Sequence, residues 1–170
     1  MGVLSGYRVI ELAGIGPGPM CAMLLSDMGA DVLKIETPPD EPEDAQSRRR
    51  AAFAYVNRNK RSLALNMKAP EGQAIFKKLA AGVDVIVEGF RPGVMKRLGG
   101  DYESLSAVNP RLVYCSLSGF GHNGPYKDYP AHDGNWEDRH PRRERERIDA
   151  IVVAPDGYFN TMYRDIGEED

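Results

Sequence analysis

The chain has 170 residues, which is the length of one ordinary domain and enough to bury a hydrophobic core. Its composition, 42% hydrophobic and 28% charged, is that of a globular protein and excludes a disordered chain. A formal net charge of -3 creates no strong overall field, so no general attraction to nucleic acid or to a membrane surface is expected.

The N-terminal segment predicts a strand, a tight turn and a helix. Residues 7–12 are apolar and rich in β-formers, and the turn that follows reads Gly14-Ile15-Gly16-Pro17-Gly18-Pro19. Proline is tolerated in the first turn of a helix, where its missing N–H would be unpaired anyway, so Pro17 and Pro19 predict the helix start. A strand, a glycine turn and a helix in this order are typical of a nucleotide-phosphate site.

The next segment bears on whether the nucleotide is NAD. Residues 30–36 predict the second parallel strand of a βαβ unit. A dinucleotide site prefers Gly-x-Gly-x-x-Gly in the turn and an acid about 20 residues later. Glu36 supplies the acid, but Pro19 replaces the third glycine and adds bulk where the helix meets the strand. The pattern therefore disfavours NAD, and it leaves open that the turn binds nothing.

A charged loop follows the second predicted strand. Its first half, residues 38–44, is acidic and rich in proline, and its second half is basic. One interpretation is a solvated loop whose charges cancel. The other is that the basic half faces a polyphosphate, because arginine and lysine bind phosphates well. The basic residues are Arg48, Arg49, Arg50, Arg58, Lys60 and Arg61.

The rest of the N-terminal region repeats the strand-helix alternation. Further strands are predicted over residues 62–66, 83–88 and 111–117, and helical segments over 70–80, 94–98 and 101–105. Five strands alternating with helices predict an α/β fold with a Rossmann-like, mostly parallel sheet and helices on both faces. Ligands of such sheets bind beyond the carboxyl ends of the strands, where this chain places turns at residues 14–19, 88–91 and 118–125.

The C-terminal part changes character. Residues 134–150 contain almost no apolar side chain and predict a charged linker, and residues 151–170 predict a hairpin that turns at Pro155-Asp156-Gly157. Cys21 and Cys115 lack metal-ligand spacing and are interpreted as reduced core thiols, so no metal is expected. The sequence shows no signal peptide and no apolar run of 18 residues, which predicts a cytoplasmic protein.

Six blocks stand in order along the chain: residues 10–19, 29–32, 59–63, 87–94, 109–112 and 118–121. Together they resemble the family III CoA-transferases, the CaiB/BaiF superfamily that includes the α-methylacyl-CoA racemases. The resemblance implies that residues 1–133 form the CoA-binding part of a Rossmann-like large domain. It also implies that the hairpin is the start of a small domain and that the chain is a truncated homologue.

The resemblance also implies a ligand site. Coenzyme A is expected as part of the substrate, with no tightly bound cofactor. The implied CoA contacts are Ile15, Gly16, Pro17, Leu65, Asn66, Met67, Lys68, Gly89, Phe90, Arg91 and Arg97. Independently of the resemblance, Lys68, Arg91 and Arg97 are cations near strand ends and helix starts, which suits pyrophosphate and ribose phosphate. For Arg97 alone, a solvated cation at a helix end is the alternative.

The turn Gly-Ile-Gly-Pro-Gly-Pro and the pair His132-Asp133 are similar to the racemase branch. Racemising a 2-methylacyl thioester needs a base on one face of the α-carbon and an acid on the other. The resemblance makes His132 one of these groups and gives Asp133 a supporting role. The opposite group, an aspartate in the family, has only Asp156 as a loose counterpart, so negligible turnover is expected.

Three functions therefore stay open. The first is racemisation of a 2-methylacyl-CoA, and the second is CoA transfer between an acyl-CoA and a carboxylic acid. The third is a non-catalytic remnant that binds CoA or only a partner chain. The expected partners are an acyl-CoA substrate and a second copy in a homodimer, which is interlocked in the family, with neither nucleic acid nor membrane.

Overall fold

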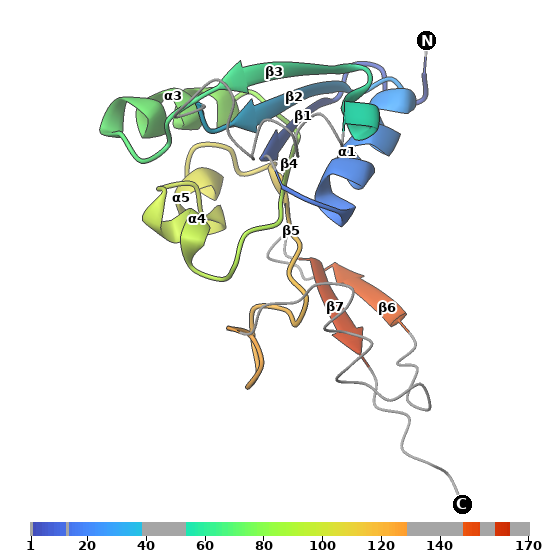
Figure 1. Ribbon diagram of the computed structural model, residues 1–170, viewed down its shortest axis with the longest axis vertical. Helices are drawn as coiled ribbons and strands as arrows, with labels where there is room; N and C mark the ends of the chain where they lie inside the picture. The colour runs from blue at the N-terminus through green and yellow to red at the C-terminus, as the bar shows by residue number, and fades with distance from the viewer. Residues whose placement is uncertain (1, 13, 39–53, 129–147, 154–158, 164–170) are drawn as a thin grey trace, which may run out of the picture.

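The computed structural model describes residues 2–12, 14–38, 54–128, 148–153 and 159–163. Its main element is a five-stranded sheet with the order β3-β2-β1-β4-β5, in which every pair of neighbours is parallel (Figure 1). This order confirms the predicted doubly wound α/β sheet. The strands are β1 (Arg8–Leu12), β2 (Asp31–Glu36), β3 (Lys60–Ala64), β4 (Val85–Glu88) and β5 (Val113–Ser116).

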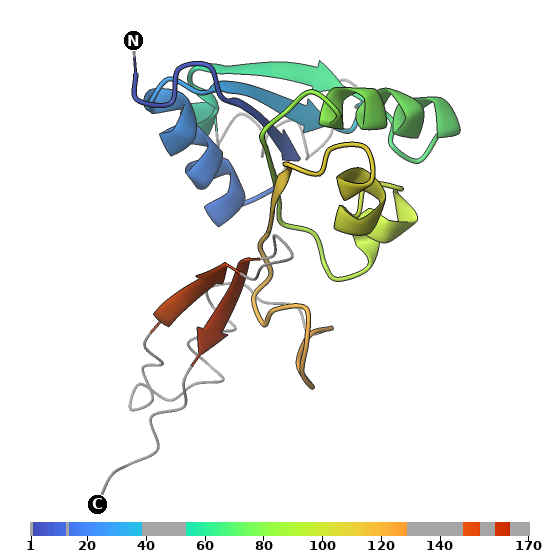
Figure 2. The same ribbon diagram turned by 180° about the vertical axis from the view of Figure 1, so that it is seen from behind.

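Helices cover both faces of the sheet, as predicted. Figures 1 and 2 show α1 on one face and α3, α4 and α5 on the other. The helices begin within two residues of their predicted starts, whereas β3 lies two residues earlier in the chain than the predicted strand 62–66. The helical elements are α1 (Pro17–Asp27), the 3-10 helix η1 (Ala54–Asn57), α3 (Pro70–Ala80), α4 (Val94–Arg97) and α5 (Tyr102–Ser106).

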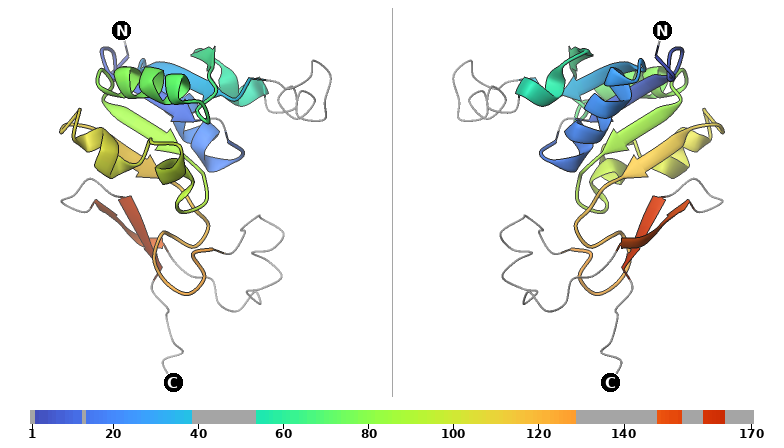
Figure 3. Two further views of the ribbon diagram at one scale, coloured as in Figure 1. Left: turned by 90° about the vertical axis from the view of Figure 1, so that its left-hand side faces the viewer. Right: turned by 90° about the vertical axis from the view of Figure 1, so that its right-hand side faces the viewer.

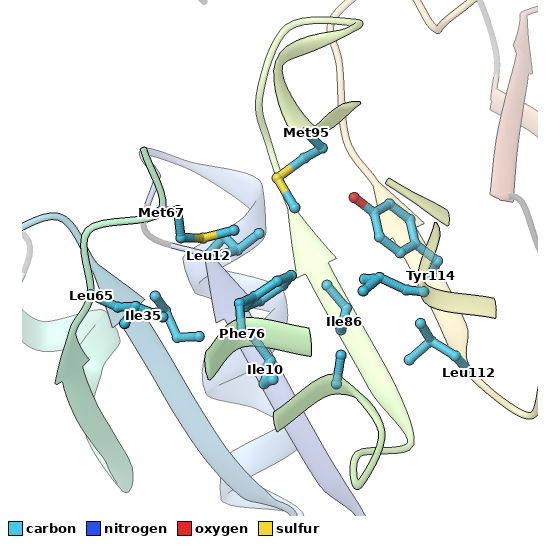
Figure 4. Packing of buried hydrophobic residues seen from close by; sticks show 12 residues of the cluster. Ile10, Leu12, Ile35, Leu65, Met67, Phe76, Ile86, Met95, Leu112 and Tyr114 are labelled. Carbon is cyan, nitrogen blue, oxygen red and sulfur yellow. The ribbon is translucent and has the colours of Figure 1, made fainter. Parts of the chain in front are cut away.

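Alternation along the strands divides the core into two clusters. Ile10 and Ile86 are fully buried on the face covered by α3 to α5, where they lie around Phe76 (Figure 4). Val9 and Val32 are buried on the opposite face beneath α1. Because successive side chains of a strand point to opposite faces, one apolar strand contributes to both clusters.

The start of α1 depends on glycine at position 16. Gly16, which precedes the helix, has φ 82° and ψ -122°, a conformation that L side chains rarely adopt. Gly18 is buried, and a Cβ added there would lie 3.8 Å from Leu117 and 4.0 Å from Val87. An added Cβ at Gly18 would thus make only ordinary contacts, and Pro17 opens the helix as predicted.

A pair of hydrogen bonds aligns the beginnings of β1 and β4. The Arg8 N–H donates to Asp84 Oδ2 over 2.8 Å, and the Asp84 N–H donates to the Arg8 carbonyl over 2.9 Å. These two residues are 76 positions apart in the sequence. The clamp therefore holds together two strands that are adjacent in the sheet but distant along the chain.

A separate antiparallel hairpin follows (Figure 3), formed by β6 (Ile148–Val153) and β7 (Phe159–Tyr163). Strand β6 begins three residues before the predicted hairpin, inside the segment predicted as a linker. The predicted turn residue Asp156 lies outside the described residues, so the division of the chain at 133 and 150 stays a prediction. Within the described ranges, no helix has the length and apolar character needed to cross a bilayer.

Candidate functional site

A cavity of about 710 Å³ opens at the carboxyl edge of the sheet, beside the ends of β1, β2 and β3. Its walls come from the turn after β1, the end of β2, η1, the segment after β3, and the turn and helix after β4. Seven of the eleven residues predicted to contact CoA line it: Ile15, Leu65, Asn66, Met67, Lys68, Phe90 and Arg97. The other four, Gly16, Pro17, Gly89 and Arg91, are not among its lining residues.

The cavity combines an apolar wall with cations at its rim. Leu65 and Met67 are buried and belong to the core cluster around Phe76 (Figure 4). Lys68 and Arg97 are exposed, and neither forms a salt bridge with another described residue. The Lys68 N–H donates to Asn66 Oδ1 over 3.0 Å, which fixes the turn after β3. An anionic ligand would therefore find two available cations next to an apolar surface.

Three basic residues of the charged segment do not face this cavity as free cations. Arg58 pairs with Asp27 over 2.5 Å, and Arg61 pairs with Asp31 over 2.6 Å. The hydrogen bond from Arg58 lowers the pKa of Asp27. Lys60 pairs with Glu11. These ion pairs with acids on α1, β2 and β1 disfavour the polyphosphate interpretation for the three residues. Residues 48–50 lie outside the described residues.

The Lys60–Glu11 pair lies inside the protein, beneath the first turn of α1. The two side chains are 1% and 0% exposed, and Lys60 Nζ lies 2.5 Å from Glu11 Oε2. The same ammonium group donates to the Pro19 carbonyl over 2.8 Å. Glu11 Oε1 has no partner among the described residues. The pair therefore anchors the start of α1 to the sheet at the edge of the cavity.

The two prolines that open α1 also limit what the helix can bind. A helix N-terminus holds anions through its free N–H groups. Of the first three helical residues only Gly18 keeps an N–H, because Pro17 and Pro19 have none. The turn after β1 is therefore a weaker phosphate site than its glycines indicated, and the rim cations are better placed for that task.

The position of the dinucleotide acid argues against NAD. Glu36 Oε1 pairs with Lys34 over 2.9 Å, and Glu36 Oε2 accepts a hydrogen bond from Ser62 Oγ over 2.9 Å. In dinucleotide-binding folds the equivalent acid binds the ribose hydroxyls. Here both oxygens already have partners on β2 and β3, and Pro19 is buried against the sheet. Both observations disfavour a dinucleotide.

A second, smaller cavity of about 180 Å³ lies at the carboxyl ends of β4 and β5, on the face covered by α4 and α5. Glu88 is 2% exposed there and accepts a hydrogen bond from the Phe90 N–H over 2.7 Å. Ser116 Oγ donates a hydrogen bond to Glu88 Oε1 and lies 2.6 Å from His122 Nε2. Burial raises the pKa of Glu88, against the hydrogen bonds from Ser116 and Phe90, and it lowers the pKa of His122.

Sequence reasoning did not single out this array. The available signal was an acid, Glu88, at the end of an otherwise apolar strand, with a serine in the same position on the next strand. No pattern in the sequence around these two residues indicated a contact with His122. The predicted catalytic pair His132 and Asp133 lies outside the described residues.

The two cysteines are free and half-buried. Burial raises the pKa of Cys115 to about 11 and also raises that of Cys21. Both observations agree with the interpretation of core thiols, because a raised pKa makes a thiol unreactive. Across the part of the chain that the structure describes, no group of three or more His, Cys, Asp and Glu side chains is arranged to hold a metal ion.

Comparison with known proteins finds a matching family model and several similar proteins. A family model described as CoA-transferase family III matches residues 4–139. The chain is 42% identical over 142 residues to the succinate–glutarate CoA-transferase of Agrobacterium fabrum, covering 76% of this chain and 36% of that protein. It is 41% identical over 133 residues to the α-methylacyl-CoA racemase of Homo sapiens, covering 78% and 32%.

Among solved structures, a CaiB/BaiF family protein from Brucella suis superposes with a TM-score of 0.72 at 35% identity. The superposition covers 88% of this chain and 44% of that one. The chain thus spans about a third of the length of the two curated relatives and less than half of the solved one.

Proposed function

Because the chain belongs to CoA-transferase family III, we propose that its larger cavity binds the CoA part of an acyl-CoA thioester. One observation carries this proposal. Seven residues expected to contact CoA, which come from three separate segments of the chain, line a single cavity at the ligand-binding edge of the sheet. Its volume of about 710 Å³ lies in the range of small-molecule sites.

The chemistry of the walls suits the different parts of CoA. Lys68 and Arg97 are the described rim cations free to bind phosphate groups, and arginine can do so with two parallel hydrogen bonds. The apolar surface of Ile15, Leu65 and Phe90 suits the adenine ring and the pantetheine arm. In this assignment the phosphates are held by side chains, because the prolines remove most N–H donors from the start of α1.

For the reaction, we place α-proton exchange of a 2-methylacyl-CoA first and CoA transfer second. The turn Gly14 to Pro19 and the pair His132-Asp133 support the racemase-like activity. The similarity to a protein named succinate–glutarate CoA-transferase supports transfer, and its 42% identity is close to the 41% found for the racemase. Both activities use the same CoA site and differ in whether a proton or the CoA group moves.

Calorimetric titration with CoA, with NAD as the control ligand, tests the binding proposal. We expect heat with CoA and none with NAD. Each of Arg97→Gln and Lys68→Gln should weaken CoA binding about tenfold, the effect of losing roughly 1.4 kcal/mol of charge-assisted hydrogen bonding. The matched controls Arg111→Gln and Lys78→Gln change exposed cations that do not line the cavity.

Two outcomes would overturn the proposal. One is the absence of heat with CoA, and the other is equal weakening by the rim variants and their controls. To separate the two reactions, mass spectrometry would follow deuterium uptake by a 2-methylacyl-CoA in D₂O, and labelled CoA moving from an acyl-CoA to a free acid. Uptake without transfer supports the racemase-like activity, and transfer without uptake supports the alternative.

A further inference from the structure

The smaller cavity contains three polar side chains in one continuous hydrogen-bonded array. Glu88 ends β4, Ser116 ends β5, and His122 lies in the loop that follows β5. Ser116 Oγ contacts both of the others, at Glu88 Oε1 and at His122 Nε2. Burying a carboxylate is costly unless it is hydrogen-bonded, and here it accepts two hydrogen bonds, one from Ser116 and one from the Phe90 N–H.

With Glu88 ionised, the array determines which nitrogen of His122 carries the proton. Ser116 has one hydroxyl proton and two neighbours. With Glu88 as a carboxylate, the hydroxyl donates to Glu88, and its oxygen then accepts from the Nε2–H of His122. Nδ1 is left with its lone pair and makes no hydrogen bond to any described residue. In this arrangement an acid orients a histidine, as in known catalytic triads, but here a serine lies between the two.

We propose that His122 is an acid–base residue of the acyl-CoA site, held in the Nε2-protonated form by Ser116 and Glu88. The proposal rests on the function proposed above. Nδ1 takes the α-proton of the acyl group, and the electron pair of the broken C–H bond forms the enolate. The positive charge gained by the imidazole is stabilised through Ser116 by Glu88. Return of the same proton, or of a deuteron that replaced it, restores the thioester.

A single short helix lines both cavities. Helix α4 is four residues long and separates them: Val94 and Arg97 line the larger cavity, whereas Met95 and Lys96 line the smaller one. At the start of α4, Gly93 has φ 80°, and a Cβ added there would meet open space. A pantetheine arm leaving the larger cavity can therefore pass over this turn towards His122.

The smaller cavity suits a short, uncharged acyl group. Its volume equals about six water molecules at roughly 30 Å³ each, which fits an acyl group of about that many non-hydrogen atoms. Three carboxylates, Glu88, Asp101 and Glu103, line it against one lysine, Lys96. Isobutyryl-CoA, a small 2-methylacyl thioester, is therefore the probe, and CoA without an acyl group is its control.

Nitrogen NMR of the full chain labelled with ¹⁵N-histidine tests the array directly. The chain has three histidines, and the signals lost in His122→Gln identify His122. We expect a neutral His122 protonated at Nε2, a tautomer preference that disappears in Ser116→Ala, and an Nδ1 signal that moves with isobutyryl-CoA but not with CoA. An Nδ1-protonated His122, an unchanged tautomer in Ser116→Ala, or an Nδ1 that ignores bound isobutyryl-CoA would each overturn the proposal.

Deuterium uptake by isobutyryl-CoA tests the acid–base role. Sequence reasoning expects negligible exchange because His132 lacks a partner, whereas a base at His122 predicts measurable uptake that falls by about 10²-fold or more in His122→Gln. His140→Gln is the matched control. Absence of uptake, or uptake that survives in His122→Gln, would overturn the role. If isobutyryl-CoA binds in either case, the CoA site stands and only His122 fails; if no CoA compound binds, both proposals fail.

Discussion

Replacing Glu11 by leucine should destabilise the fold strongly. In the native protein the Lys60 ammonium is 1% exposed, and its partners are Glu11 Oε2 at 2.5 Å and the Pro19 carbonyl at 2.8 Å. Glu11→Leu leaves that charge buried with the carbonyl alone. Breaking a buried ion pair in this way costs about 3–5 kcal/mol. For a chain of this length, such a loss lowers Tm by about 6–20 °C.

A double-mutant cycle separates the pair from the general cost of substitution. Glu11→Leu with Lys60→Met removes both charges and should recover most of the stability, because replacing a whole buried pair by apolar groups is often neutral or stabilising. The exposed pair Arg61–Asp31 provides the control, and Asp31→Ala should cost about 0–1 kcal/mol. Urea unfolding at pH 7, followed by far-UV circular dichroism, measures the wild type, Glu11→Leu, Lys60→Met, their double variant and Asp31→Ala. A Glu11→Leu cost no larger than that of Asp31→Ala, or no recovery in the double variant, would refute the reasoning.

Three further predictions concern the first turn, the thiols and the pH dependence. Gly16→Ala should lower the free energy of unfolding by about 1–3 kcal/mol and weaken CoA binding, because Gly16 has φ 82°. Gly14 has no positive φ and only an ordinary contact, so Gly14→Ala should have a much smaller effect in both urea unfolding and CoA titration. Cys115 should react slowly with Ellman's reagent in the native protein at pH 8 and rapidly in denaturant, because a thiol with a pKa of about 11 is ionised to about one part in a thousand at that pH. Cys21, whose pKa burial also raises, should likewise react more slowly in the native protein than in denaturant, and fast native reaction of either thiol would contradict the burial. Because the pKa of His122 is lowered in the folded chain, its imidazole takes up a proton at a higher pH in the unfolded chain. The free energy of unfolding should therefore fall as the pH drops from about 6.5, until the folded imidazole is also protonated. Urea unfolding of the wild type and His122→Gln between pH 7 and pH 5 should therefore give a flatter curve for the variant, and parallel curves would contradict this.

Local sequence signals were sufficient for most of the fold. Pro17 and Pro70 each open a helix at the predicted residue, because proline at the first helical position sacrifices no hydrogen bond. The alternation of short apolar strands with helices predicted the parallel sheet. The boundaries of β3 were less predictable, because this edge strand carries Lys60 and Arg61, whose polar side chains resemble those of a loop.

The candidate site was predictable only in part, because it depends on partners distant in the sequence. Resemblance placed seven residues that line the larger cavity, but no local pattern could show that Lys60 turns inwards to meet Glu11, 49 positions away. His122 was equally hidden, since its partner Ser116 acquires a role only when β5 lies beside β4 and Glu88. Such contacts follow from the assembled sheet, whereas helix starts follow from the chemistry of neighbouring residues.

The clamp between Arg8 and Asp84 affects the order in which the strands pair during synthesis. Closing the loop of 76 residues between them costs about 4 kcal/mol of chain entropy, roughly 1 kcal/mol more than pairing β1 with the nearby β2. We therefore expect the unit β1-α1-β2 to form first. During synthesis, Asp84 emerges about 50 residues after the end of β2, which takes about 2–10 s at ribosomal speed. For those seconds the β4-facing edge of β1, with its apolar Val9 and Ile10, is open to other nascent chains, and the arrival of Asp84 ends that exposure.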